Sequence, residues 1–535
     1  MNNSRSAFLS LITRSTNTQM LLAMLSGLFI ALPFVSAPFF YTTWFAFVPV
    51  LLAIQQASLA KTYGLGLICG SATYMVGAYW IVDFLMLFKH YSPVKSFIWS
   101  LIFWFYSAQL PALLLVTFQY LKRATVIPEL ILFPIIVVCF FACFPMLFSA
   151  QLGESQALFL TALQATDITG VYGLDAIIAL FNLVLVQLLL KQANIMGVGL
   201  SGGIIVSWFA YGMVTLNHWN QELKTWPSSL IGIVQPNETP SLEKPKIYPG
   251  YSRAYSPEMD MTERLAQAGA QLVVWPEARY KAFFDEPHVK RAYQSRIKQL
   301  GITLIFQDME QFRHPETKKV STRFNAAAII DSSGNQAGHY QKRKRVAFGE
   351  YIPLITDLPF LRFWVKDFFG NFTNEITKGT TPTHFSADNF SITPLVCYEV
   401  MFPTFVAQAI PQRNQQGLLV AMSSNGWFGE TKQPYQHIYS ATLRAVENRM
   451  PMIHAVNNGP STATLPTGEI ILLTEFHQAG GYLVDLPYST QHHSSFFQQH
   501  PRWFIGACII ALLAMCFISV LPHSRLKGKY SAAED

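Results

Sequence analysis

Long apolar runs divided by short polar segments fill the first two fifths of the chain. A helix needs about 20 mostly apolar residues to cross a bilayer. Runs of suitable length predict membrane-spanning helices near residues 20–38, 41–57, 63–88, 95–121, 128–149, 172–191, 196–216 and 503–521. The shorter stretch 154–167 has an acidic residue at each end and predicts an interfacial or re-entrant segment. The pattern therefore predicts a helical bundle of about eight spans.

The first apolar run has two interpretations. The tripeptide Val35-Ser36-Ala37 resembles a signal-peptide cleavage site, so this run could be removed on export. Further apolar runs follow it directly, and we therefore favour an uncleaved membrane anchor.

Basic residues between the runs predict the orientation of the bundle, because cytoplasmic loops are rich in Lys and Arg. If an odd number of spans precedes residue 217, most of the basic residues near the ends of the spans lie on the same side of the membrane. These residues are Arg5, Arg14, Lys61, Lys122, Arg123, Lys191, Arg525, Lys527 and Lys529. Lys89 and Lys95 oppose this orientation. The bias predicts that residues 217–500 lie outside the inner membrane.

The pattern changes near residue 217, where shorter apolar runs alternate with amphipathic stretches. Strands are predicted at 230–234, 271–275, 302–307, 325–330, 392–396, 417–422 and 452–456. Helices are predicted at 258–269, 287–299, 401–410 and 434–449. Strands alternating with helices indicate an α/β layer structure. We therefore divide the chain into a transmembrane helix bundle (1–216), an exported α/β domain (217–500) and a C-terminal helix with a cytoplasmic tail (501–535).

Composition supports the membrane interpretation. Hydrophobic residues make up 51% of the chain and charged residues 13%, whereas charged residues make up about 25% of ordinary soluble proteins. The formal net charge is +7, and the basic residues form no stripe with interleaved aromatic residues. This pattern excludes nucleic acid as an expected partner.

Cys397 is the only one of the six cysteines that lies in the predicted exported domain. No CxxC pattern or Cys/His cluster suggests a zinc site, and no nucleotide motif is visible, so we expect neither a metal nor a cofactor. Cys397 follows the strand at 392–396 and precedes a helix. An exposed thiol near the positive end of a helix dipole favours the reactive thiolate.

Two carboxylates and a lysine in the same domain complete a catalytic set. Glu277 ends the segment Val273-Val274-Trp275-Pro276-Glu277, and Lys342 and Glu350 belong to the basic loop 340–353. A carboxylate can take the proton of the thiol, and an ammonium, with the backbone N–H of Tyr398, can stabilise an oxyanion. Lys344 competes with Lys342 for this role.

These motifs resemble the nitrilase, or carbon–nitrogen hydrolase, superfamily, whose Glu-Lys-Cys triad matches Glu277, Lys342 and Cys397. With its membrane bundle and closing span, nearly the whole chain resembles the bacterial apolipoprotein N-acyltransferase family. The resemblance also includes Val234-Gln235-Pro236-Asn237, Phe348-Gly349-Glu350-Tyr351, Cys397-Tyr398-Glu399, Trp427-Phe428-Gly429, Gln436-His437, Arg444-Ala445-Val446-Glu447 and Asn457-Asn458-Gly459. The spacing to Phe348-Gly349-Glu350 favours Lys342 over Lys344. The chain departs from the family at Ala347, Ser424-Asn425 and Pro460, where the family usually has Pro, Asn-Asp and an aliphatic residue.

The resemblance implies a four-layer αββα sandwich on an eight-helix bundle in the inner membrane, with the catalytic domain on the periplasmic side. It implies that an acyl group passes from a phospholipid, typically phosphatidylethanolamine, through a thioester on Cys397 to the α-amine of S-diacylglyceryl-cysteine apolipoproteins. That reaction is the last step of lipoprotein maturation. It further implies that Glu350 supports the triad and that Tyr398 and Glu399 line the site. We expect a monomer.

The segment 358–369 is unusually apolar for the exported domain. It is either a core helix or an arm that uses Phe360, Phe363, Trp364 and Phe368 to enter the membrane surface.

Two other functions stay open at this point. A membrane-tethered amidase or nitrilase would use the same thioester with water as the acceptor. A lipid transporter or binding scaffold with an inactive domain would need intramembrane charges, of which Asp83 and Asp175 are the visible candidates.

Overall fold

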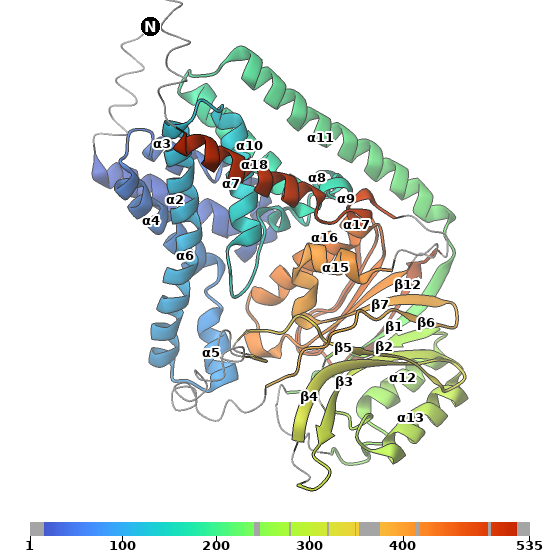
Figure 1. The fold of residues 1–535 in the computed structure, drawn as a ribbon. Helices are drawn as coiled ribbons and strands as arrows, with labels where there is room; N and C mark the ends of the chain where they lie inside the picture. Colours follow the sequence, from blue (N-terminus) through green and yellow to red (C-terminus); the bar gives the residue numbers. More distant parts are fainter. Residues whose placement is uncertain are drawn as a thin grey trace, which may run out of the picture.

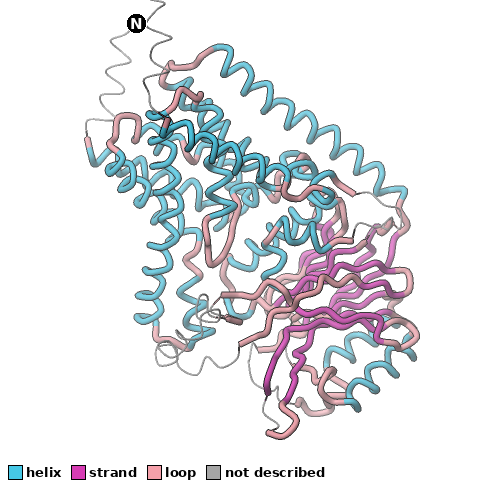
Figure 2. Tube along the Cα trace, in the orientation of Figure 1, coloured by secondary structure: helices cyan, strands magenta, loops and turns pink. Residues whose placement is uncertain are grey.

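The computed structural model describes residues 15–239, 247–277, 280–317, 320–347, 349–351, 375–411, 417–489 and 494–521. These residues form a bundle of helices next to a β-sandwich that has helices on its outer faces (Figure 1). Figure 2 shows the two parts as a helical half and a half rich in strands. The predicted aromatic arm and the basic residues at both chain ends (Arg5, Arg14, Arg525, Lys527 and Lys529) lie outside the described residues.

The bundle is built from consecutive helices with short connections. They are α2 (Thr16–Val35), η1 (Ala37–Phe45), α3 (Val48–Ala53), α4 (Leu59–Gly77), α5 (Ile81–Lys89), α6 (Pro93–Ala124), α7 (Glu129–Cys143), η2 (Leu152–Gln156), α8 (Leu160–Leu163), α9 (Thr166–Thr169), α10 (Val171–Leu189), α11 (Ile195–Glu222) and η3 (Leu223–Thr225). After the sandwich, α17 (Phe496–Gln499) leads into α18 (Trp503–Val520), which returns to the bundle beside α7 (Figure 1).

The predicted number of about eight spans is not confirmed. Among the described residues, the helices long and apolar enough to cross a membrane are α2, α6, α10, Ile195–Thr225 and α18, and α4 with α5 adds a sixth if this pair, bent by 54°, counts as one span. The predicted spans at 41–57 and 128–149 are instead the shorter apolar helices Ala37–Ala53 and Glu129–Cys143. At about 1.5 Å per residue, neither reaches across a hydrocarbon core of about 30 Å.

Glycines allow α4 to approach its neighbours closely. A Cβ on Gly66 would lie 2.5 Å from Cα of Ala112 in α6, and one on Gly70 would lie 2.6 Å from Cα of Ala108. Small residues at helix contacts are typical of membrane bundles, since packing rather than hydrophobic burial holds the helices together there. This packing fixes the end of α4, which borders the site described below.

The sandwich contains two six-stranded sheets, with the orders β12-β1-β2-β3-β4-β5 and β11-β10-β9-β8-β7-β6. Their strands are β1 (Ser228–Gln235), β2 (Leu272–Val274), β3 (Thr303–Arg313), β4 (Val320–Ile330), β5 (Gln336–Gln341), β6 (Phe385–Ala387), β7 (Phe390–Val396), β8 (Leu418–Ser423), β9 (Met452–Val456), β10 (Thr462–Thr464), β11 (Ile470–Leu473) and β12 (Gly480–Pro487). The helices are α12 (Pro257–Gln267), α13 (Pro287–Leu300), η5 (Cys397–Met401), α15 (Pro403–Ala409), η6 (Gly426–Phe428) and α16 (Gln433–Asn448).

Side chains alternate between the two faces of each strand, so each sheet has a core on both faces and the sandwich has four layers. One core lies between the sheets, where Ile233, Val274 and Ile305 meet residues such as Val420 and Ile453. A second core joins the other face of the first sheet to α12 and α13, and a third joins the second sheet to α15 and α16. The αββα sandwich implied by the family resemblance is confirmed.

Helix α16 lies between the sandwich and the bundle and is buried on both sides. Ala441 and Ala445 pack toward the second sheet, whereas Tyr439, Leu443 and Val446 belong to the core of the bundle. The segment 154–167, predicted to be interfacial, forms the short turns η2, α8 and α9, of which η2 and α9 contact α16. The two parts therefore share a continuous packed interface.

Every predicted strand corresponds to a strand of the structure, and the four predicted helices correspond to α12, α13, α15 and α16. Sequence analysis missed β5, β6 and β10–β12, because these strands are short or alternate too weakly to stand out. The boundaries at 216/217 and 500/501 stay predictions; α11 continues past the first of them to Glu222.

Candidate active site

Cys397 lies where β7 ends and the short 3-10 helix η5 begins. Its φ angle is +50°, in the left-handed region that non-glycine residues rarely adopt. β7 is an inner strand between β6 and β8, so the surrounding sheet holds this strained turn in place. The side chain is half-buried and stands at the edge of the second sheet.

Glu277 and Lys342 reach the same point from the first sheet. Glu277 follows β2 after Trp275 and Pro276, and Lys342 is the first residue after β5. The carboxyl group of Glu277, the thiol of Cys397 and the ammonium of Lys342 lie close enough to interact electrostatically with one another. The structure thus brings together the three residues proposed from the sequence.

Two polar residues hold this arrangement. Nδ2 of Asn325, on β4, donates to Oε1 of Glu277 (2.6 Å) and to Oε1 of Glu350 (3.1 Å). Nζ of Lys342 donates to Oε1 of Glu350 over 2.9 Å. Nε2 of Gln307, on β3, donates to the side-chain oxygen of Asn325 over 2.9 Å, which fixes the direction of the Asn325 amide. Glu350 thus supports the triad by direct contact.

The pKa values define the resting protonation of the site. Burial raises the pKa of Cys397, Glu277 raises it further and Lys342 opposes both. Burial and the nearby carboxylates thus oppose the preference for the thiolate that the position at a helix start suggests. Burial also raises the pKa of Glu277. Burial alone would lower the pKa of Lys342, but Glu350, Glu277 and Cys397 raise it overall.

Tyr398 and Glu399 have different positions. Tyr398 borders the hollow described below, and its hydroxyl donates to the carbonyl of Leu147 over 2.8 Å. Glu399 is fully buried behind the site, where it accepts hydrogen bonds from the Tyr340 hydroxyl and the backbone N–H groups of Arg343, Lys344 and Val396. Glu399 therefore ties the lysine loop to the cysteine strand and does not line the hollow.

Lys344 lies away from the carboxylates that hold Lys342. Its ammonium lies 5.1 Å from the centre of the Phe402 ring, and its side chain is exposed. Lys342 is 1% exposed and paired with Glu350. The geometry therefore favours Lys342 for the catalytic role.

His437 supports the cysteine turn from α16. Its Nε2 lies 3.2 Å from the carbonyl oxygen of Cys397, and burial lowers its pKa to about 4, so a neutral ring donates this hydrogen bond. Nδ1 is then an acceptor, 3.4 Å from Oδ1 of Asn425. The reverse orientation of that amide would supply the missing donor. The family usually has Asp at the position of Asn425. In this chain the neutral ring of His437 thus has a neutral amide as its partner.

Sequence analysis missed Asn325 and Gln307 as site residues. The only signal at Asn325 is an isolated amide before three alanines in a buried strand. Such a polar residue needs a buried partner, but the sequence does not identify that partner.

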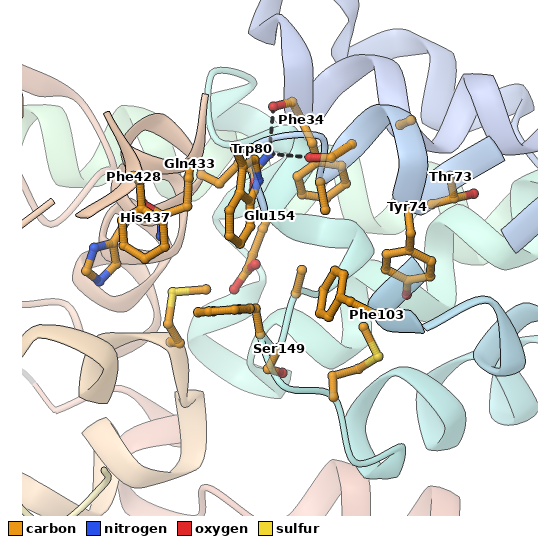
Figure 3. A pocket seen from close by; sticks show the side chains of 18 of the residues that line it. Phe34, Thr73, Tyr74, Trp80, Phe103, Ser149, Glu154, Phe428, Gln433 and His437 are labelled. Atoms are coloured by element: carbon orange, nitrogen blue, oxygen red, sulfur yellow. Dashed lines mark hydrogen bonds between the residues drawn. The ribbon is translucent and has the colours of Figure 1, made fainter. Parts of the chain in front are cut away.

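A largely apolar hollow opens from Cys397 into the bundle. The space between atoms in this hollow is about 1010 Å³, a figure that includes open solvent. Its walls come from α2, α4, the break before α5, α6, the segment after α7, η5 and α16. Figure 3 shows Trp80, Phe103, Phe428 and His437 around it. The hollow thus connects Cys397 with helices of the predicted membrane part.

Comparisons with known proteins find a different family model for each of two parts of the chain. Residues 26–184 match the family model of the apolipoprotein N-acyltransferase N-terminal domain, and residues 252–511 match that of carbon-nitrogen hydrolases. An apolipoprotein N-acyltransferase of Geobacter metallireducens is 30% identical over 91% of this chain and 93% of its own length. One of Bdellovibrio bacteriovorus is 27% identical over 63% of each chain. A solved amidase of Nesterenkonia sp. has 20% identity and a TM-score of 0.36, covering 52% of this chain and 95% of its own.

The α/β part thus matches the family model of carbon-nitrogen hydrolases. With both family models and the full-length relative, the chain belongs to the apolipoprotein N-acyltransferase family.

Proposed function

We propose that Cys397 carries an acyl group from a phospholipid to the α-amine of a diacylated apolipoprotein, with Glu277 as general base and acid and Lys342 as oxyanion stabiliser. The chain is an amide-forming acyltransferase of lipoprotein maturation, as its family implies. The observation that carries the proposed roles is the position of Cys397, which contacts Glu277 on one side and borders the apolar hollow on the other.

In the first half-reaction, Glu277 removes the proton of the Cys397 thiol as the sulfur attacks the ester carbonyl. The ammonium of Lys342 lies beside both groups and can stabilise the negative oxygen of the tetrahedral intermediate. The N–H of Tyr398, in the first turn of η5, has no intrahelical acceptor and can add a second hydrogen bond. Glu277 then protonates the lysophospholipid oxygen as the C–O bond breaks, which leaves a thioester.

In the second half-reaction, the neutral α-amine attacks the thioester. The C–N bond forms, the C–S bond breaks, and Glu277 transfers a proton from nitrogen to the departing sulfur. The products are the N-acylated lipoprotein and the original thiol. Lys342 stays protonated throughout, in keeping with its raised pKa.

The donor, location and oligomeric state belong to the same proposal. The apolar walls of the hollow fit an acyl chain, and phosphatidylethanolamine is the donor that we expect. Several apolar helices and family membership make this a membrane protein. We propose that it is a monomer in the inner membrane with its catalytic part on the periplasmic side, as the family resemblance implies.

Incubation of the purified full-length protein with labelled phosphatidylethanolamine tests this function. An adduct of acyl mass on Cys397 that hydroxylamine removes is the expected result, and addition of a diacylated peptide should transfer the label to its amino terminus. Absence of the adduct from active protein would refute the proposed intermediate.

A hydrolase of the amidase type is the second candidate, because the same triad can pass a thioester to water. The hollow has apolar walls and reaches the bundle, which favours a lipid over a small polar amide. Release of free fatty acid at the same rate with and without the peptide would support the hydrolase.

A further inference from the structure

The hollow contains a carboxylate that the proposed mechanism does not use. Glu154, on η2, lines the same hollow as Cys397 although its side chain is 2% exposed. Figure 3 shows this side chain pointing into the hollow between Trp80 and the residues near Phe428. An acid in an otherwise apolar chamber needs a physical explanation.

Only one oxygen of Glu154 has an evident structural role. Oε2 accepts a hydrogen bond from the backbone N–H of Gln151 over 3.2 Å, which closes the first turn of η2. Oε1 is buried and has no hydrogen bond of normal geometry among the described residues, since the nearby Ser440 hydroxyl donates to the carbonyl of Gln436. Buried acceptors are nearly always satisfied in native proteins, so an unsatisfied one that faces a binding chamber points to a ligand with a donor group.

Helix α16 shows that Glu154 and Cys397 occupy neighbouring levels of the hollow. His437 contacts the carbonyl of Cys397, and Ser440, three residues further along α16, interacts with Glu154. Three residues correspond to about 4.5 Å along a helix. Measured along the axis of α16, a substrate group bound at Glu154 would therefore lie within one helical turn of Cys397.

Carboxyl groups outnumber basic groups around Glu154. The neighbouring ionisable groups are Asp175 on α10 and Arg444 and Glu447 on α16, which gives three carboxyl groups for one guanidinium. Burial raises the pKa of Glu154 to about 7, while Arg444, the Gln151 N–H and Ser440 lower it. The group can thus bind or release a proton near neutral pH.

The second half-reaction requires such a group. An α-amine with a pKa of about 8 arrives mostly as an ammonium ion at neutral pH. Two protons must leave its nitrogen to form an amide, and the departing sulfur takes only one of them through Glu277. The other proton needs a separate acceptor.

We propose that Glu154 binds a primary ammonium group of the substrate inside the hollow and, where this group is the α-amine of the acceptor, takes its first proton. The inference rests on the proposed acyl transfer through Cys397. A primary ammonium also occurs in the ethanolamine head group of the donor, so the two half-reactions have to be measured separately.

The test compares the wild-type protein with Glu154→Gln, which keeps the shape of the side chain, and with Glu154→Asp, which keeps its charge. Glu447→Gln is the matched control, because Glu447 belongs to the same buried group of charges but does not line the hollow. Acyl-enzyme formation is measured with phosphatidylethanolamine and with phosphatidylglycerol carrying the same acyl chains. Single-turnover transfer from preformed acyl-enzyme to a diacylated peptide is measured between pH of about 5 and about 9.

If Glu154 binds the acceptor, Glu154→Gln slows transfer by about tenfold at neutral pH. The defect disappears above the pKa of the amine, and Glu154→Asp restores part of the rate. If it binds the head group, the preference for phosphatidylethanolamine over phosphatidylglycerol is lost in the first half-reaction instead. Either result supports the proposal.

Equal rates of Glu154→Gln and wild-type protein in both half-reactions would overturn the ammonium site. A loss of rate in Glu154→Gln would also overturn it if the loss is the same for both donors, does not depend on pH and occurs equally in Glu447→Gln. Such results leave the proposed function intact as long as the wild-type protein forms acyl-enzyme and product. Failure of the wild-type protein to form acyl-enzyme would instead refute the function.

Discussion

Two groups of buried ionisable residues near Cys397 are built differently. In the catalytic group, Asn325 and Lys342 donate to the carboxylates of Glu277 and Glu350, and the backbone N–H of Val346 donates to the second oxygen of Glu350. In the second group, Arg444 forms an ion pair with Glu447, while Oε1 of Glu154 and Oδ2 of Asp175 have no partner among the described residues.

The difference separates two uses of buried charge. Hydrogen bonds fix the catalytic carboxylates before substrate arrives, so little reorganisation is needed during the reaction. The second group keeps an acceptor open toward the hollow, which is useful only if a ligand supplies the donor. Experiments that damage one group and spare the other can test this distinction.

Removal of the nucleophile should have the largest effect. We expect Cys397→Ala to abolish acyl-enzyme formation and to lower transfer by at least about 10⁴-fold, because no other group can carry the acyl chain. Triacylation of a diacylated peptide is the measurement. Continued triacylation by this variant would show that Cys397 is not the acyl carrier.

Glu277→Gln should leave the thiol without its base. Since the pKa of Cys397 is raised by burial, the thiol is protonated at rest, and we expect acylation to slow by about 10² to 10⁴-fold. Intact mass as a function of time measures this rate. An unchanged unfolding temperature in detergent distinguishes loss of the base from misfolding.

Asn325→Ala and Glu447→Gln compare the two groups directly. Loss of the Asn325 amide frees Glu277 and Glu350, so we expect about a tenfold to hundredfold slower acylation. Glu447→Gln weakens the ion pair with Arg444 and its bond from the Val171 N–H, so we expect a loss of stability of about 1–3 kcal/mol with normal acylation per folded molecule.

Thermal unfolding in detergent gives the stability, and labelled phospholipid gives the rate. The comparison fails if Asn325→Ala affects only stability while Glu447→Gln affects only the rate.

His437 should make the protein sensitive to acid. Its folded pKa of about 4 lies below the usual value of about 6.5, so between these values the unfolded chain binds a proton that the folded chain does not. Stability therefore falls as the pH decreases through this window, with a contribution of about 3 kcal/mol. Between pH of about 7 and about 4, the unfolding temperature of the wild-type protein should fall more than that of His437→Gln. An equal fall in both proteins would assign the acid sensitivity to other groups.

The predicted arm should have the smallest effect. Replacement of Phe360, Phe363, Trp364 and Phe368 by Ala is expected to slow turnover of membrane phospholipid by a few-fold (about 2- to 10-fold), since less apolar area would enter the membrane surface. A water-soluble ester substrate provides the control. Equal slowing with both substrates would indicate a core segment.

The sequence alone determined the kind of protein and predicted its triad. Apolar runs predicted the helical part, strand patterns predicted strands β1–β4 and β7–β9, and local motifs suggested Glu277, Lys342 and Cys397 as the triad. These features are encoded over a few neighbouring residues, where periodicity and spacing carry the information.

Only the tertiary structure decided what surrounds them. Asn325, His437 and Glu154 come from three distant segments and acquire their roles through contacts with Glu277, Cys397 and the hollow. The raised pKa of Cys397 likewise follows from its burial among residues of both sheets. Contacts between distant segments and removal from water depend on how the whole chain packs, and no local pattern specifies them.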